Sequence, residues 1–90
     1  MSLPDGVAPY NTTPRFTAET VPRGLLKDHS LKAGTWGLIQ VHAGELRYFL
    51  AGETQPLATL QTEQSWAVPP EVLHFVELSD DGVFSVVFHR

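Results

Sequence analysis

Two histidines, His29 and His74, are the residues of this chain best suited to chemistry. Imidazole is the commonest neutral metal ligand in proteins, and near neutral pH it also serves as a hydrogen-bonding group. His74 follows the turn-forming segment 69–73, Pro-Pro-Glu-Val-Leu, and shares a strand face with Val76 and Leu78. We therefore expect the two rings to meet inside the fold, where they would bind a divalent metal, Zn²⁺ or Fe²⁺, or a small molecule.

Each histidine also has a plain structural interpretation, as a buried ring hydrogen-bonded to backbone or to water. A metal site generally takes three protein ligands, and only His29 and His74 stand out. The candidates for a third ligand are Asp28, Glu71 and Glu77, and each of these carboxylates also suits an exposed position. The sequence therefore leaves both interpretations open.

Aromatic residues supply the candidates for a ligand pocket. Tyr48 lies on an apolar strand face and could donate a hydrogen bond to a ligand or to a backbone carbonyl. Trp36 is the second pocket candidate, although large aromatic rings also fill the cores of small domains. His42 and His89 share their strand faces with polar side chains, so we expect both at the surface.

Other catalytic arrangements lack support in the sequence. The chain has no cysteine, which excludes disulfides and thiolate chemistry. Ser30 follows His29 directly, but neighbouring strand residues point to opposite faces and cannot form a nucleophile–base pair. Asp80 and Asp81 precede Gly82, a combination typical of a turn rather than of acid–base catalysis.

Composition and charge indicate one globular domain that does not bind nucleic acid. A chain of 90 residues has room for one core, and 42% hydrophobic residues is ordinary for a globular protein. The net charge is −4 and the six Lys and Arg residues are scattered, whereas nucleic-acid binding needs a clustered basic face. No stretch resembles a signal peptide or a membrane span, so we expect a cytoplasmic protein without membrane contact.

Short strands separated by turn signals dominate the predicted secondary structure. Residues 1–14 are rich in Pro, Gly, Thr and Asn and are expected to form an irregular arm, which leaves residues 15–90 as the folded domain. No segment of ten or more residues carries the 3.6-residue period of an amphipathic helix. The expected strands are 15–21, 25–31, 36–42, 45–51, 56–60, 65–68, 73–78 and 83–89.

Ala43 and Gly44 are expected to form the tight turn of a hairpin, since glycine accepts the positive φ that such turns require. The strands on either side, 36–42 and 45–51, would then pair directly. Strands of this length and spacing are typical of an antiparallel sandwich or barrel. The expected fold class is therefore all-β, with a single domain and no substantial helix.

The order of these motifs resembles the cupin jelly roll. Cupins carry a first motif with two His and one Glu, followed by a turn glycine, and a second motif, Pro-x-Gly-x-x-His. Residues 69–74 keep the Pro and His of the second motif, with Glu71 in place of its Gly. His29 lies at about the right distance before Gly44 to be the first His of the first motif. Leu31 takes the place of the second His, and the motif's Glu has no counterpart.

This pattern of kept and lost residues resembles one small-cupin family, the TehB/YeaR-like domain, which is associated by name with tellurite resistance. The resemblance implies a cupin-like domain over residues 15–90 with His29 and His74 as the retained metal ligands. Lys27 departs from the family, whose members often carry an acidic residue there, and this change removes one potential metal ligand. The resemblance depends on residues 29–37 (His-Ser-Leu-Lys-Ala-Gly-Thr-Trp-Gly), 44–46 (Gly-Glu-Leu), 69–74 and 79–81 (Ser-Asp-Asp).

The function that this resemblance implies is binding of a divalent metal or a small ligand inside the barrel, in connection with tellurite or oxyanion stress. Two alternatives stay open. One is a mononuclear non-haem metal enzyme, a dioxygenase or isomerase, which would need a metal with open positions. The other is a ligand-sensing or partner-binding module, because family members resemble domains fused to a methyltransferase that 90 residues cannot contain.

The last strand predicts a homodimer. Residues 83–88 are apolar on both faces, although one face of such a sheet normally meets water. The arm of residues 1–14 would lie across the second subunit, or alternatively fold back over its own sheet. An exposed apolar patch of this kind is typical of an interface. The expected patch consists of Val83 and Val87 with Ile39, Val41 and Phe49.

Overall fold

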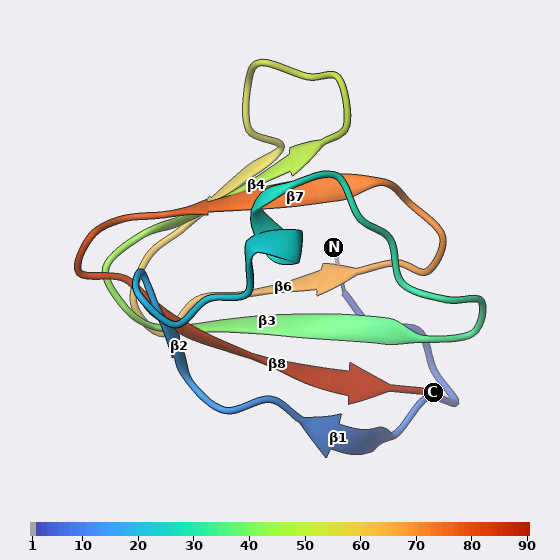
Figure 1. Cartoon of the computed structure of the whole chain (residues 1–90). Helices are drawn as coiled ribbons and strands as arrows, with labels where there is room; N and C mark the ends of the chain where they lie inside the picture. Colours follow the sequence, from blue (N-terminus) through green and yellow to red (C-terminus); the bar gives the residue numbers. More distant parts are fainter. Residues whose placement is uncertain (1) are drawn as a thin grey trace.

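A computed structural model describes residues 2–90, which fold as a sandwich of two antiparallel β-sheets (Figure 1). The larger sheet has five strands and the smaller has three. The all-β, single-domain class expected from the sequence is confirmed. The strands are β1 (Pro9–Thr12), β2 (Phe16–Thr17), β3 (Trp36–Ala43), β4 (Leu46–Leu50), β5 (Ala58–Leu60), β6 (Ser65–Val68), β7 (His74–Leu78) and β8 (Val83–His89).

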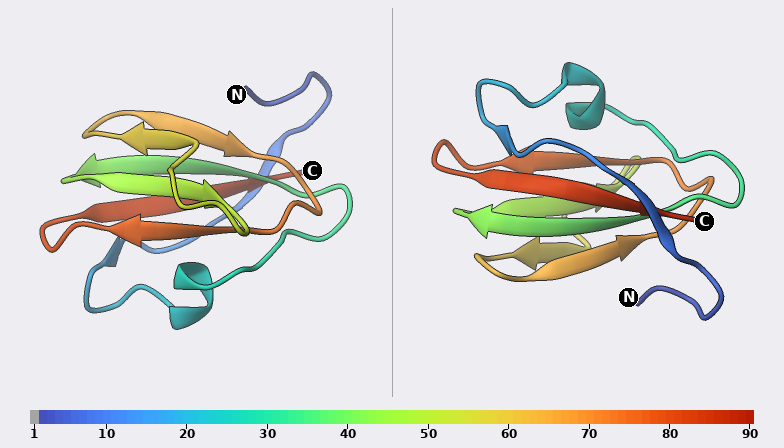
Figure 2. Two further views of the ribbon diagram at one scale, coloured as in Figure 1. Left: turned by 90° about the horizontal axis from the view of Figure 1, so that it is seen from above. Right: turned by 90° about the horizontal axis from the view of Figure 1, so that it is seen from below.

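Each sheet is assembled from strands that are distant in the sequence. The larger sheet has the order β1-β8-β3-β6, with β2 also pairing with β8, and the smaller has the order β5-β4-β7. Figure 2 shows the two sheets stacked on each other when seen from above and below. The closed barrel that the sequence allowed is not found in residues 2–90, because the strands pair into two separate sheets.

The chain crosses between the sheets at a corner built around Gly44. The hairpin predicted here is wrong, because β3 pairs with β6 and β8 whereas β4 pairs with β5 and β7. Gly44 has a φ of 68°, and a Cβ at this position would lie 2.6 Å from Ser79 Oγ and 2.7 Å from Gly82 Cα. The β7–β8 turn therefore packs closely against the β3–β4 turn, and glycine is needed for both conformation and space.

Strand β1 lies along the free edge of β8, in a region where the sequence predicted an irregular arm. Its pairing with β8 has a register shift between Pro9 and Asn11, and Ala8 and Arg90 exchange two further backbone hydrogen bonds of 3.1 Å. The predicted irregular arm is therefore wrong for residues 9–12. The sequence did not reveal this strand, because an edge strand tolerates proline and shows no apolar alternation. This part of the arm lies on its own sheet.

The segment 25–31, predicted to be a strand, instead contains the end of a 3₁₀ helix, η1 (Arg23–Leu26), and an isolated bridge at His29. Proline fixes the backbone at Pro22, whose carbonyl accepts a hydrogen bond of 3.0 Å from Leu25 N, so the chain turns before it can extend. No helix among residues 2–90 is long and apolar enough to cross a membrane.

The core lies between the sheets and is filled by alternate residues of their strands. Ile39 is 4% exposed and Val41 is 1% exposed, and both belong to the core cluster. Their predicted outward position in a dimer patch is therefore wrong. Because strand residues alternate, Leu38, Gln40 and His42 occupy the outer face of β3. The sequence did not show which face points inward, because apolar Leu38 lies on the outer one.

Candidate functional site

His29 and His74 lie side by side because their backbones pair directly. Each backbone N–H donates to the other residue's carbonyl oxygen at 2.9 Å, which forms an isolated antiparallel bridge. Directly opposed residues in such a pair project from the same face. The ring centroids are 4.1 Å apart in an edge-to-face arrangement, with an interplanar angle of 63°. The structure thus brings together the two histidines selected from the sequence.

The same short-range hydrogen bond orients both rings. His29 Nδ1 lies 2.9 Å from the carbonyl oxygen of Lys27, and His74 Nδ1 lies 2.8 Å from that of Val72. A carbonyl oxygen only accepts, so Nδ1 carries the proton in each neutral ring and Nε2 keeps its lone pair. The side-chain type at Lys27 does not affect this bond, because the backbone makes it.

Burial controls the charge of His74, which is only 3% exposed. Loss of water lowers the pKa of His74 below its ordinary value, because the charged imidazolium is poorly solvated there. The hydrogen bond to the Val72 carbonyl opposes this effect, and the neighbouring His29 lowers the pKa further by charge repulsion. Neutral His74 therefore offers Nε2 as a hydrogen-bond acceptor at physiological pH.

Both rings contribute to the wall of a cavity of about 250 Å³ between the sheets, beside η1. Apart from the two histidines and Thr13, the side chains of the wall are apolar and come from β2, η1, β3, β6, β7, β8 and the adjoining loops. Gly37 widens the cavity, because a Cβ there would lie 3.2 Å from both Leu31 and Val86. Sequence reasoning missed Gly37, because the sequence placed Ile39, which shares its strand face, on the outer side of the sheet.

The turn before His74 explains how glutamate replaces the glycine of the cupin-like motif. Glu71 has a φ of 62°, a left-handed conformation that glycine adopts without steric cost. Its backbone N–H donates to the carbonyl oxygen of Leu31 at 2.8 Å, which ties the turn to the segment that carries His29. Glu71 thus occupies a backbone conformation that favours glycine, the residue that the cupin motif carries at this position.

Tyr48, a predicted pocket residue, packs against His74 but does not line the cavity. Its ring centroid lies 5.1 Å from that of His74 and 5.9 Å from that of Trp66. Tyr48 is 1% exposed, and burial raises the pKa of its hydroxyl. Within residues 2–90, neither the Tyr48 hydroxyl nor Trp66 Nε1 has a hydrogen-bond partner. Tyr48 therefore supports the His74 ring from the side.

Trp36, the other predicted pocket residue, lies on the opposite face of β3 from the cavity. Its neighbour Gly37 lines the cavity, and adjacent strand residues point to opposite faces. The assignment of Trp36 to this pocket is therefore corrected.

The two remaining histidines lie away from the cavity. His89, expected at the surface, is 8% exposed, and its Nδ1 lies 3.0 Å from the Val87 carbonyl oxygen. His42 is partly exposed on the outer face of β3, as its alternation predicted. Its Nε2 lies 2.7 Å from Ser85 Oγ.

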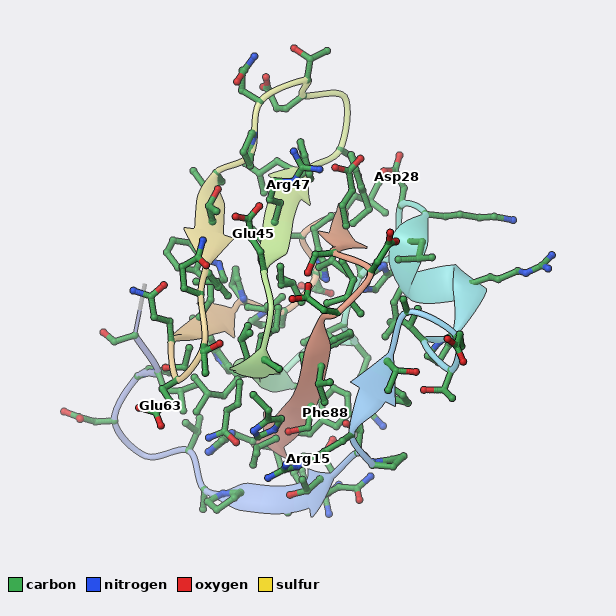
Figure 3. The ribbon with its side chains drawn as sticks, turned by 90° about the vertical axis from the view of Figure 1, so that its left-hand side faces the viewer. Arg15, Asp28, Glu45, Arg47, Glu63 and Phe88 are labelled. Carbon is green, nitrogen blue, oxygen red and sulfur yellow. The ribbon has the colours of Figure 1, made fainter. Side chains whose placement is uncertain are left out.

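A metal held by His29 and His74 would need further ligands, and the nearby carboxylates do not supply them. Among residues 2–90, no group of three His, Cys, Asp or Glu side chains could hold an ion. Asp28 is exposed beside η1 (Figure 3). Glu77 pairs with Arg47 at 2.8 Å, and both side chains are about half exposed. The donor set therefore does not fit a metal with three protein ligands.

The fold and the paired histidines define a small β-sandwich domain with an apolar internal cavity. The chain belongs to the TehB-like family, whose model, described as the TehB-like domain, matches residues 11–86. A search of curated proteins finds no match. The wider relationship to cupins stays a prediction from the sequence motifs.

Two solved structures are similar to this chain, and they differ in sequence identity and in the share of their length that is matched. TehB from Haemophilus influenzae is 29% identical with a TM-score of 0.82, over 94% of this chain and 32% of that chain. The chain thus spans about a third of that protein's length. A protein from Escherichia coli strain K12, solved by a structural genomics consortium, is 23% identical with a TM-score of 0.86, over 100% of this chain and 96% of that chain. At this identity the second likeness shows the fold alone.

Proposed function

We propose that this chain is a binding module that takes a small, mostly apolar molecule into the cavity and recognises one hydrogen-bond donor through His29 and His74. The observation that carries the proposal is that a backbone carbonyl oxygen binds Nδ1 of each ring. This bond leaves both Nε2 atoms available beside an apolar wall. Pockets with a few polar groups in an apolar lining are typical of small-molecule sites.

The size of the cavity limits the ligand. An engineered apolar cavity of about 150 Å³ holds benzene, so a cavity of about 250 Å³ suits a substituted single ring or a short aliphatic chain. A hydroxyl or N–H group on such a molecule would donate to Nε2 of a neutral histidine.

A small inorganic oxyanion suits this cavity poorly. Apolar walls do not replace the water of a charged ion, and burial lowers the pKa of His74, so this ring does not readily supply a compensating charge. Membership of the TehB-like family suggests a link to tellurite resistance. We propose that this link is indirect and passes through an organic ligand, so tellurite should not compete for the cavity.

A metal-dependent function is the second candidate, favoured only by the proximity of the two Nε2-bearing rings. It would require the bound molecule or water to complete the coordination, because the described residues supply no third ligand. Metal analysis of protein purified without chelators or a nickel column distinguishes the two candidates. A stoichiometric divalent metal that is lost in His74→Ala and kept in His89→Ala would overturn the metal-free proposal.

The direct test compares phenol with toluene, which has a similar shape and no donor. NMR titration of the whole ¹⁵N-labelled chain should show shifts at Gly37, Ile39 and Val76 with both molecules. Replacing His74 by Leu should lower the phenol-to-toluene affinity ratio about fivefold, because one hydrogen bond to the ligand is lost.

The matched control is His89→Leu, because His89 makes the same Nδ1 bond to a carbonyl two residues earlier but lies away from the cavity. This variant should keep the wild-type affinity ratio. Absence of shifts at the cavity with either molecule, or an unchanged ratio in both His29→Leu and His74→Leu, would contradict the proposed function.

We also propose the homodimer predicted from the sequence, now through a smaller patch. Leu38 pairs in register with Val87, and both are only partly buried on the outer face of the larger sheet. Phe49 instead stacks on Phe75 in the smaller sheet, with 4.6 Å between centroids. Light scattering should give about twice the chain mass of 9.9 kDa, and Leu38→Lys should restore the monomer mass. A wild-type mass of one chain, unchanged on dilution, would contradict the dimer.

A further inference from the structure

The outer face of the larger sheet is divided into an apolar half and a polar half. In the polar half, Ser65 on β6, Gln40 on β3 and Ser85 on β8 are paired in register and form a row across three strands. In the next row, Leu38 pairs with Ala67 and Val87, all apolar. Ser85 places a polar residue in the middle of β8, whose other residues are apolar except for His89 at its end.

His42 stands one step further along β3 and is fixed to this row. Its Nε2 lies 2.7 Å from Ser85 Oγ, and Ser85 is only 4% exposed. The bond joins residues 43 positions apart in the sequence, so the fold rather than local structure creates it. It orients the His42 ring, whose Nδ1 has no protein partner among the hydrogen bonds of residues 2–90.

A polar groove of about 400 Å³ lies over Gln40, His42 and Ser65, and its lining includes two residues of opposite charge, which form its walls. Arg15 belongs to the segment between β1 and β2, whereas Glu63 belongs to the turn between β5 and β6 (Figure 3). In residues 2–90 the salt bridges involve only Arg47 with Glu45 and Glu77, so Arg15 and Glu63 have no ionic partner within 4.0 Å.

The backbone holds the Glu63 wall in place. Glu63 N donates to Val41 O at 2.8 Å and Val41 N donates to Gln64 O at 3.0 Å, which ties the turn to β3. Glu63 has a φ of 70°, a conformation that its turn imposes. The carboxylate therefore projects from a fixed support beside the groove.

We propose that this groove binds a small zwitterion of the amino-acid type, with its carboxylate on Arg15 and its ammonium group on Glu63. Gln40, His42 and Ser65 would satisfy the remaining polar atoms from the floor. Opposite charges on two walls select a ligand with both charges, since a simple anion meets Glu63 and a simple cation meets Arg15. The site is separate from the internal cavity and does not depend on the function proposed for it.

The test is an NMR titration of the whole chain with a series of unbranched amino acids: glycine, β-alanine, 4-aminobutyrate and 6-aminohexanoate. We expect the amides of Gln40, His42 and Gln64 to shift, with one chain length binding best because the two walls have a fixed separation. Acetate and ethylamine, which carry one charge each, should bind about tenfold more weakly than that best zwitterion.

Arg15→Gln and Glu63→Gln should each weaken the best zwitterion about tenfold, while Arg47→Gln on the other sheet should leave its affinity unchanged. Unfolding curves of the variants verify that the fold is kept. The proposal is overturned if no member of the series shifts the groove amides, if acetate binds as well as the zwitterions, or if both wall variants bind like wild type.

Discussion

The internal cavity and the external groove use the same strand for opposite purposes. The inner face of β3 gives Gly37 and Ile39 to the cavity, and the outer face gives Gln40 and His42 to the groove. In the cavity, the carbonyl of residue i−2 binds Nδ1 of His74 and leaves Nε2 available. In the groove, Ser85 binds Nε2 of its histidine. The partner of each ring thus decides which nitrogen can meet a ligand.

His74 and His42 also differ in their surroundings. His74 is buried among apolar groups that lower its pKa, so it suits a neutral ligand. His42 lines a partly exposed groove together with the guanidinium of Arg15 and the carboxylate of Glu63, which suits a charged ligand. Under the two proposals the same type of side chain would serve two kinds of recognition, and the following predictions test this contrast.

The largest expected effect is the loss of stability when the ring of His74 or of His42 is removed. His74→Ala should lower the free energy of unfolding by about 2–3 kcal/mol, because a buried ring packed on Tyr48 and His29 leaves a void. His42→Ala should cost about 0.5–1 kcal/mol, because its partner Ser85 loses one hydrogen bond near solvent. Urea denaturation measures both values. Equal losses for the two variants would contradict the contrast between the sites.

The second prediction concerns pH. The pKa of His74 is lower in the folded state than in the unfolded chain, where it is about 6.5. Between these two values the unfolded chain binds more protons, so the stability contributed by neutral His74 falls as pH falls from about 6.5. Below the folded pKa this contribution is fully lost and no longer changes.

Urea midpoints measured between neutral and acidic pH check this dependence. His74→Leu should flatten the stability curve in this range, while His42→Leu should leave its slope close to that of wild type. An unchanged slope in His74→Leu would contradict the assignment of this acid sensitivity to His74.

Local sequence signals predicted strands well and strand partners poorly. The ranges 65–68 and 83–89 coincide with β6 and β8, because turn residues bound each apolar run. The hairpin at Gly44 was wrong, since glycine permits a tight turn but does not determine whether the next strand pairs with the previous one or joins the other sheet. Pairing depends on contacts between distant segments.

The candidate site was predictable in its residues but not in its geometry. His29 and His74 were selected from motif spacing, yet they meet through a backbone bridge inside a segment expected to be a regular strand. The groove escaped prediction because His42 and Ser85 are 43 residues apart and each looks like an ordinary polar strand residue. Trp36 was misplaced because both faces of β3 carry apolar side chains.

A smaller effect is expected at Tyr48, whose hydroxyl is buried without a partner among residues 2–90. Tyr48→Phe should raise the free energy of unfolding by about 1 kcal/mol, because the unpaired hydroxyl no longer has to be desolvated. Urea denaturation measures this change, with Tyr10→Phe on the exposed edge as a control. A loss of stability would mean that the hydroxyl has a partner in solution, such as bound water.

The smallest effect is expected where each site has a glutamate in the left-handed conformation. Glu71 beside the cavity has a φ of 62°, and Glu63 beside the groove has a φ of 70°. A non-glycine residue in the left-handed conformation raises the free energy of the folded state by about 1–2 kcal/mol. Glycine avoids this strain, but its larger loss of backbone entropy on folding costs about 0.5–1 kcal/mol. Glu71→Gly and Glu63→Gly should therefore each stabilise the fold by about 0.5 kcal/mol.

Glu53→Gly is the control, because Glu53 is exposed in a loop and does not have a positive φ. It should be neutral or destabilising, since glycine adds flexibility to the unfolded chain without relieving strain. The two stabilised variants should then differ in binding. Glu71→Gly should keep amino-acid binding in the groove, whereas Glu63→Gly should lose it together with the carboxylate. If Glu63→Gly bound the amino acids like wild type, the turn would support the fold alone and the groove would not recognise an ammonium group.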